Sequence, residues 1–169
     1  MKQHEYKYHW YKVFKKSILL WFLILIQIGL CSFYIYSPLA FPFPELIIFN
    51  VILSALTIPG FILHINHLCR TRNTTFILKY ESISLQRNTE ITTLNSNDIC
   101  KIILHEGPTK SRFPWYDYNW VEFIDTNGKS IAVSFYLLEI SDFWMNTLSR
   151  RVNSKHFERN WNLFPLMKK

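Results

Sequence analysis

The sequence predicts a membrane α-hairpin of two transmembrane helices followed by an α+β domain. Three observations predict this class. Two long apolar runs lie near the N-terminus, an alternation of apolar and polar residues begins after residue 73, and one segment of helical periodicity follows the alternating runs. A chain of 169 residues suits one compact domain together with a smaller part.

The first apolar run, residues 17–36, carries no charged side chain. About 20 such residues, at a rise of ~1.5 Å each, match the ~30 Å hydrocarbon core of a bilayer. The run is longer than the apolar core of a cleavable signal peptide, which is the less favoured alternative. The second run, residues 45–65, is also long enough to span a membrane. A proline-rich turn at residues 37–45 joins the two and predicts antiparallel helices.

Basic residues flank the predicted hairpin, residues 17–68. Residues 1–72 contain seven Lys or Arg and two acidic residues, whereas residues 73–169 contain twelve and ten. The turn has no Lys or Arg, so the positive-inside rule predicts that both termini are cytoplasmic. The basic and aromatic segment 1–16 then lies at the membrane interface. A nucleic-acid polymer is not an expected partner, because the basic excess is not on the folded domain.

Alternating runs predict the strands of the C-terminal part. They cover residues 74–80, 82–87 and 90–95, a run that starts near residue 99, and two arms around Asn127-Gly128. Asn-Gly between alternating runs is a strong β-hairpin signal. In its first arm Val121 and Phe123 are expected to face the core, and Tyr118 and Trp120 the opposite side.

One amphipathic helix is predicted after the strands. Apolar residues recur with helical spacing at Ile140, Phe143, Trp144, Leu148 and Val152. Strands followed by a single helix predict a strongly bent antiparallel sheet, or open barrel, whose open end the helix closes. This domain is assigned to residues 73–153, and residues 154–169 form a tail.

A family resemblance supports this fold. The runs "YESISL", "NDICKI", "YNWVEFIDTNGKSIAV" and "LLEISDFWMNTL", within residues 74–152, resemble the pleckstrin-homology-like (PH-like) domains of small bacterial membrane proteins with two N-terminal spans. The resemblance implies a bacterial inner (cytoplasmic) membrane and an interaction module on its cytoplasmic side. It also raises phosphoinositide binding, but the first strands offer only Lys79 and Arg87, separated by Glu81, so headgroup binding is not favoured.

The sequence contains no recognisable catalytic constellation. Its four glycines are isolated, and no phosphate-binding loop, nucleophile elbow or zinc-protease motif occurs. His64 and His67 with Cys69 could contribute to a metal site, yet histidines at a helix end more often pack at an interface. His105-Glu106 is an equally weak acid–base candidate. We therefore expect no enzyme activity, no metal and no cofactor.

The aromatic stretch "PWYDYNW", residues 114–120, permits two interpretations. In the favoured one, the rings pack within the fold. In the other, a patch protrudes and docks on a bilayer or a protein. The candidate residues for that patch are Phe113, Trp115, Tyr116, Lys110 and Arg112.

The tail offers a second candidate contact surface. Phe157, Trp161 and Phe164 are spaced i, i+4 and i+7 among basic residues, which predicts an interfacial helix.

These features favour a non-enzymatic integral membrane protein that presents its PH-like domain for protein or membrane-surface interaction. The expected partners are the lipid bilayer and either a second copy or another membrane protein. The alternative is a ligand-gated membrane effector, whose small β-barrel senses a nucleotide second messenger and drives oligomerisation of the spans. In that case Gln27 and Asn50 would supply contacts between helices.

Overall fold

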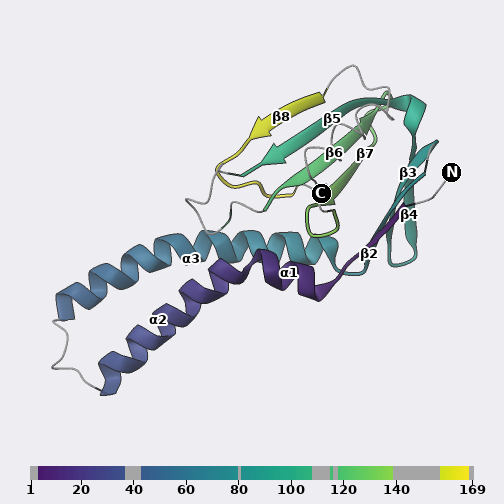
Figure 1. Ribbon diagram of the computed structural model, residues 1–169. Helices are drawn as coiled ribbons and strands as arrows, with labels where there is room; N and C mark the ends of the chain where they lie inside the picture. The colour runs from purple at the N-terminus through teal and green to yellow at the C-terminus, as the bar shows by residue number, and fades with distance from the viewer. Residues whose placement is uncertain are drawn as a thin grey trace.

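The computed structural model in Figure 1 shows two long helices that project side by side from a pair of β-sheets. The structure describes residues 4–36, 43–79, 81–107, 115, 118–138 and 157–167. The chain begins with β1 (His4–Lys7), α1 (Trp10–Lys16), α2 (Ile18–Tyr36) and α3 (Phe43–Thr71). It continues with β2 (Thr74–Leu78), β3 (Ser82–Arg87), β4 (Glu90–Asn95), a 3-10 helix (Ser96–Asp98), β5 (Ile99–Glu106), β6 (Trp120–Asp125), β7 (Ser130–Ser134) and β8 (Phe157–Trp161).

Helices α2 and α3 form the hairpin that the two apolar runs predict (Figure 1). They contain 19 and 29 residues, and both are long and apolar enough, by length and composition, to cross a membrane. Their outward side chains are large and exposed: Leu25 is 65% and Ile35 is 74% accessible. So extensive an apolar surface marks a region that contacts lipid or another protein.

The first sheet has the strand order β1-β2-β3-β4, and its neighbours are antiparallel. β2, β3 and β4 confirm the strands expected between residues 74 and 95. β1 precedes the hairpin and β2 follows it, yet Tyr6 pairs with Phe76. The hairpin is therefore inserted between two neighbouring strands of one sheet. The sheet pair also includes residues 4–7, outside the 73–153 boundaries, because four residues carry too little alternation to signal a strand.

The second sheet has the order β7-β6-β5-β8. The hairpin expected around Asn127-Gly128 is confirmed, because β6 and β7 pair across it and Gly128 has the positive φ of 79° that such a turn needs. A carboxylate oxygen of Asp125 accepts hydrogen bonds from the backbone N–H groups of Asn127 and Lys129, at 2.9 and 2.8 Å. These side-chain-to-backbone hydrogen bonds stabilise the turn.

The interfacial helix expected at Phe157, Trp161 and Phe164 is wrong. Residues 157–161 form β8, which runs parallel to β5 in the register of Ile102 with Phe157. Strand pairing satisfies the backbone groups on the free edge of β5, a gain that helical spacing of side chains cannot reveal. A salt bridge of 2.9 Å from Lys101 to Glu158 joins the two strands. The amphipathic helix expected at residues 140–152 lies outside the described residues.

The two sheets share one apolar core. The rings of Phe76 and Phe123 stack at its centre, with centroids 6.0 Å apart, and Val121 is fully buried. The prediction that Val121 and Phe123 face the core is therefore confirmed. The other buried members are Leu78, Ile83, Leu94, Ile99, Ile102, Leu104, Ile131, Val133, Leu137 and Leu138. Among the described residues the strands form two packed sheets, and no closed barrel.

Candidate functional site

One row of side chains on α3 is buried along most of the helix and joins the hairpin to the sheets. Its members are three or four residues apart and so share one helix face: Leu53, Thr57, Gly60, His64, His67 and Thr71. The first half of the row faces α2, since Thr57 hydrogen-bonds to Gln27 and Gly60 lies against Leu20. The second half faces the sheets, as the two histidines show.

His67 is fully buried beneath the end of β7. Its Nε2 lies 3.0 Å from the carbonyl oxygen of Pro165, which can only accept, so Nε2 carries the hydrogen. In the neutral ring Nδ1 is then an acceptor, and the Ser134 hydroxyl donates to it at 2.9 Å. The same hydroxyl oxygen accepts from the Tyr136 backbone N–H at 3.2 Å. His67 thereby connects the helix, β7 and the C-terminal segment through a satisfied chain of hydrogen bonds.

His64, one helical turn earlier, contacts two tyrosines. Its Nδ1 lies 3.1 Å from the Tyr118 hydroxyl and 3.0 Å from the Tyr136 hydroxyl. The Trp21 ring packs edge-on against the imidazole, with centroids 5.9 Å apart. Both histidines thus make hydrogen bonds within the fold. Cys69, the third member of the suggested metal set, is exposed, and no group of three or more metal-ligating side chains occurs among the described residues.

The contact region between the hairpin and the sheets is called the junction below. Trp115, which is 3% exposed, lies at its centre. It belongs to a buried cluster with Val13, Leu63, Tyr118 and Tyr136. Its indole N–H donates to the Leu163 carbonyl at 3.0 Å. A protruding position for Trp115 is therefore wrong, and packing, the favoured interpretation, is correct for this ring. The physical reason is that α3 and the C-terminal segment both cover it, and neither is adjacent in sequence.

The other members of the suggested patch, Phe113, Tyr116, Lys110 and Arg112, lie outside the described residues.

Lys16, the last residue of α1, makes a further contact with the chain just after β7. Its ammonium group donates to the Phe135 carbonyl and lies 5.7 Å from the centroid of the Phe135 ring. The next residue, Ser17, is fully buried and donates to the Val13 carbonyl at 2.9 Å. The chain is therefore attached to the sheet region by half-buried or buried polar contacts on both sides of the hairpin, from Lys16 before α2 and from the histidines of α3.

Replacing His67 by leucine is expected to lower the stability of the junction by about 2–3 kcal/mol, because Ser134 and Pro165 lose their partner while buried. The measurement is the thermal midpoint of the β-sheet circular dichroism signal in detergent. His9→Leu is the matched control, since His9 is exposed and makes no side-chain cap bond to α1. Equal midpoints for the two variants would contradict the assignment.

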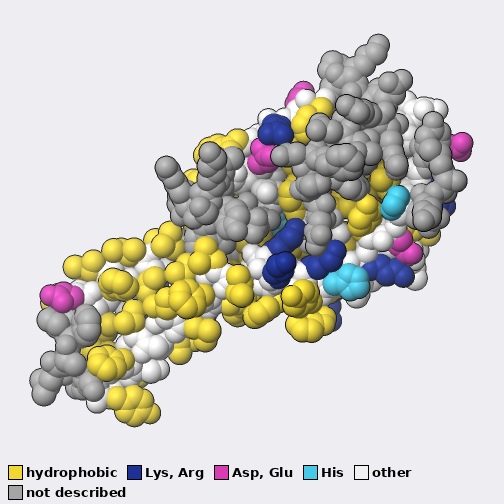
Figure 2. All heavy atoms as spheres, in the orientation of Figure 1, with side chains coloured by type: hydrophobic (Ala, Val, Ile, Leu, Met, Phe, Trp, Pro, Cys, Tyr) yellow, Lys and Arg dark blue, Asp and Glu magenta, His cyan; other side chains and the backbone are white. Residues whose placement is uncertain are grey.

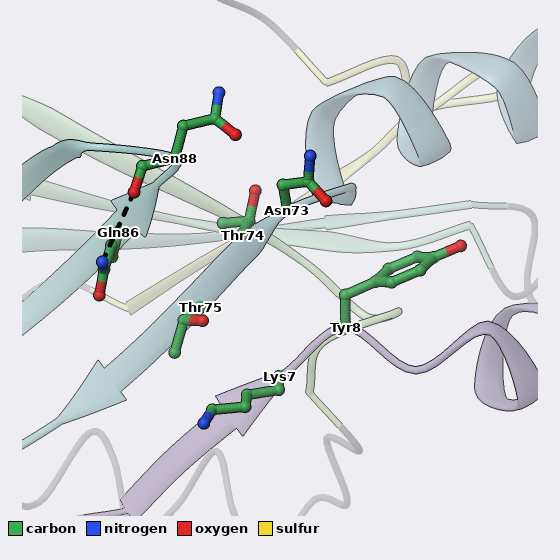
Figure 3. A pocket seen from close by; sticks show the side chains of 7 residues that line it. All are labelled: Lys7, Tyr8, Asn73, Thr74, Thr75, Gln86 and Asn88. Atoms are coloured by element: carbon green, nitrogen blue, oxygen red, sulfur yellow. Dashed lines mark hydrogen bonds between the residues drawn. The ribbon is translucent and has the colours of Figure 1, made fainter.

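A polar hollow of about 330 Å³ lies where the chain leaves β1 and re-enters at β2 (Figure 3). Its lining combines amides and hydroxyls with one cation, as Figure 3 shows: Lys7, Tyr8, Asn73, Thr74, Thr75, Gln86 and Asn88. A smaller hollow of about 150 Å³ has Arg70 and Arg87 at its rim. The Arg87 guanidinium donates to the Cys69 carbonyl at 2.9 Å, at the end of α3.

The suggested pair His105-Glu106 is not brought together by any described contact. Instead, the His105 Nε2 lies 3.3 Å from a Glu122 carboxylate oxygen on the neighbouring strand. The imidazole stacks on Trp120, with centroids 3.6 Å apart. His105 and Trp120 are both buried, on the face of β5 and β6 opposite the core residues Val121 and Phe123, and neither described hollow is lined by them.

Sequence reasoning missed the junction partners Tyr136, Ser134 and Pro165. The available signal was the i, i+3 spacing of His64 and His67 within an apolar run, which implies two polar groups that need partners on one helix face. Which residues supply those partners depends on how the sheets dock against α3.

Comparison with known proteins identifies one family. A protein-family model described as a PH domain matches residues 5–144 of the chain, a span that includes most of β1, both long helices and β2 to β7. Neither the curated proteins nor the solved structures contain a match.

Proposed function

We propose that this chain, which belongs to the PH domain family, is a non-enzymatic membrane protein whose hairpin holds a PH domain at the cytoplasmic face of a bacterial inner membrane. The domain would serve contacts with a protein or with the membrane surface. The observation that carries the proposal is the position of the hairpin, between β1 and β2 of one sheet. The hairpin connects two paired strands, so the sheets cannot lie far from it. If the exposed apolar hairpin is inserted in a bilayer, the domain is held at the membrane surface.

The lengths of the helices support insertion in a bilayer. About 20 residues cross ~30 Å of hydrocarbon. Counted from the turn, such a length ends at Ser17 on α2 and at Ile62 on α3. The polar contacts of the junction, from Lys16 and His64, begin directly beyond these two positions.

The domain would have one fixed orientation relative to the hairpin. Only Arg72 and Asn73 separate α3 from β2, so no flexible linker intervenes. The chain crosses between hairpin and sheets twice, and the histidine contacts fasten α3 beneath the second sheet. A fixed mounting suits a module that presents the same face to a partner at the membrane.

The side of the membrane follows from charge. Lysines concentrate in residues 1–16, Arg70 and Arg72 lie at the end of α3 and just beyond it, and residues 37–42 have neither Lys nor Arg. By the positive-inside rule, the sheets and both termini face the cytoplasm.

The polar residues of the hairpin favour an anchor over a ligand-gated effector. Gln27 donates to the Ser54 hydroxyl at 2.8 Å and accepts from Thr57 at 3.3 Å. Asn50 donates to the Leu46 carbonyl at 3.0 Å and accepts from the Cys31 thiol at 3.6 Å. These groups make contacts within one hairpin, which is the simpler role for single polar residues in apolar helices.

A matched pair of lysine substitutions tests the membrane placement. Leu25 in α2 is 65% exposed and Ile91 in β4 is 63% exposed. If α2 spans a bilayer, Leu25→Lys costs about 2.5–3.5 kcal/mol of insertion free energy, whereas Ile91→Lys costs none. Cells expressing each variant are fractionated, and the share of protein that resists alkaline carbonate extraction is measured. A smaller resistant share is expected for Leu25→Lys alone.

Two results would overturn the proposal. One is release of the unaltered chain by carbonate. The other is digestion of residues 118–138 by protease added to intact spheroplasts, with protection in inverted vesicles. Calorimetric titration of the whole chain in nanodiscs with cyclic nucleotides addresses the alternative, because an anchor should give no binding heat.

A further inference from the structure

Two segments from opposite ends of the chain expose large apolar side chains near the place where the hairpin meets the sheets. In α1, Tyr11 is 62% and Phe14 is 48% exposed. In the C-terminal segment, Trp161 is 59%, Leu163 is 42% and Phe164 is 45% exposed. Exposed rings clustered at one level of a fold mark a contact surface more often than isolated ones do.

Buried contacts place the two segments at the same level of α3. Phe164 stacks on Trp115, with ring centroids 5.5 Å apart. Trp115 in turn lies over Gly60, where an added Cβ would be 3.6 Å from its ring. Val13 of α1 belongs to the same buried cluster as Trp115 and Leu63. Both segments therefore flank α3 between Gly60 and Leu63.

This level coincides with the edge of the hydrocarbon layer inferred from the helix lengths. Phe14 is three residues outside Ser17, the C-cap of α1, so it lies at most ~4.5 Å further from the hydrocarbon at the helical rise. The polar headgroup layer is about 5–7 Å thick on each side of a bilayer. Phe14 and the exposed Lys15 thus fall within the depth where aromatic and basic side chains are favoured.

The charges near α1 match an anionic surface. Figure 2 shows dark blue Lys and Arg side chains gathered over α1, between the yellow helices and the sheets. Lys12, Lys15 and Lys16 lie within α1, which has no acidic residue in its first turn. In β8, the acidic Glu158 is already paired with Lys101.

We propose that α1 and residues 161–164 form one interfacial ledge that binds the headgroup layer of the same bilayer, with a preference for anionic phospholipid. The ledge consists of Tyr11, Phe14, Lys15, Trp161, Leu163 and Phe164. The proposal rests on the membrane placement above and names the surface that the mounted domain contacts. Two contact points, one from each end of the chain, would also restrict rotation of the domain about the hairpin axis.

Spin labels at four positions test the ledge. Cys31, Cys69 and Cys100 are replaced by serine, and a nitroxide is attached in turn to Phe14→Cys, Trp161→Cys, Ile28→Cys or Ile91→Cys. Each labelled chain is reconstituted in phosphatidylcholine vesicles with or without an equal share of phosphatidylglycerol. Depth is read from the relative accessibility of the nitroxide to oxygen and to a water-soluble nickel chelate.

The expected order of depth is Ile28 deepest, Phe14 and Trp161 together at headgroup depth, and Ile91 in water. Phosphatidylglycerol should move the two ledge labels deeper, and Lys15→Glu should abolish that shift at position 14. A deep Ile28 label with one or both ledge labels as water-exposed as Ile91 overturns the ledge alone. A water-exposed Ile28 label overturns the membrane placement and the ledge together. Ledge labels at equal depth in both lipid mixtures overturn the anionic preference.

Discussion

The fragment 73–169, without the hairpin and β1, is expected to be unable to fold into a stable monomer. It lacks Tyr6, a half-buried ring that packs against the core residue Phe76, and all four backbone partners of β2 in β1. The fragment also exposes the rings of Trp115, Tyr118 and Tyr136. Val13 and Leu63, which complete their buried cluster in the whole chain, are absent from it. Size-exclusion chromatography and urea unfolding of the fragment should show aggregation or no cooperative transition.

A second chain separates the two causes. Residues 1–8 joined by a short Gly-Ser turn to residues 73–169 restore β1, because Lys7 pairs with Thr75 and the strand ends are therefore adjacent. This chain should regain cooperative unfolding yet bind a hydrophobic dye through the uncovered Trp115 cluster. Monomeric fragment 73–169 with the unfolding midpoint of the whole chain would show that the sheets do not depend on the N-terminal segment.

Trp115→Ala is expected to destabilise the junction by about 3–5 kcal/mol, the range for removing a large buried ring. The indole fills the space between Gly60 and Phe164 and anchors the Leu163 carbonyl. Its loss should therefore release the C-terminal segment as well as lower stability. The measurement is the midpoint of unfolding by far-ultraviolet circular dichroism in detergent, combined with the rate of proteolysis after residue 157.

Trp10→Ala is the matched control, because the Trp10 ring is 72% exposed. Exposed substitutions usually change stability by less than about 0.5 kcal/mol. If Trp115→Ala behaved like Trp10→Ala, Trp115 would not hold the junction together.

Local patterns predicted the elements whose signal lies within a few neighbouring residues. The apolar runs gave the correct helices because length and absence of charge suffice to identify them. Val121 and Phe123 were correctly placed in the core, because period-two alternation directly reports which side of a strand is buried. The Asn127-Gly128 turn was equally local, since it requires a residue that tolerates positive φ.

The sequence did not predict two of the strands, because their pairing partners lie far away along the chain. β1 is short, and its partner β2 lies beyond the whole hairpin. β8 has side chains at helical spacing, but pairing with the edge of β5 determines its conformation. Backbone hydrogen bonds between distant segments leave no periodic trace in either sequence.

By itself, the amino-acid sequence determined two apolar helices, their basic flanks and a set of alternating strands, since each follows from the chemistry of adjacent residues. Only the tertiary structure decided that the hairpin interrupts a sheet, that Trp115 is buried, and that His64 and His67 bond to Tyr118 and Ser134. These outcomes depend on which surfaces meet when α3 docks against the second sheet. Burial and hydrogen-bond satisfaction then select partners that are far apart along the chain.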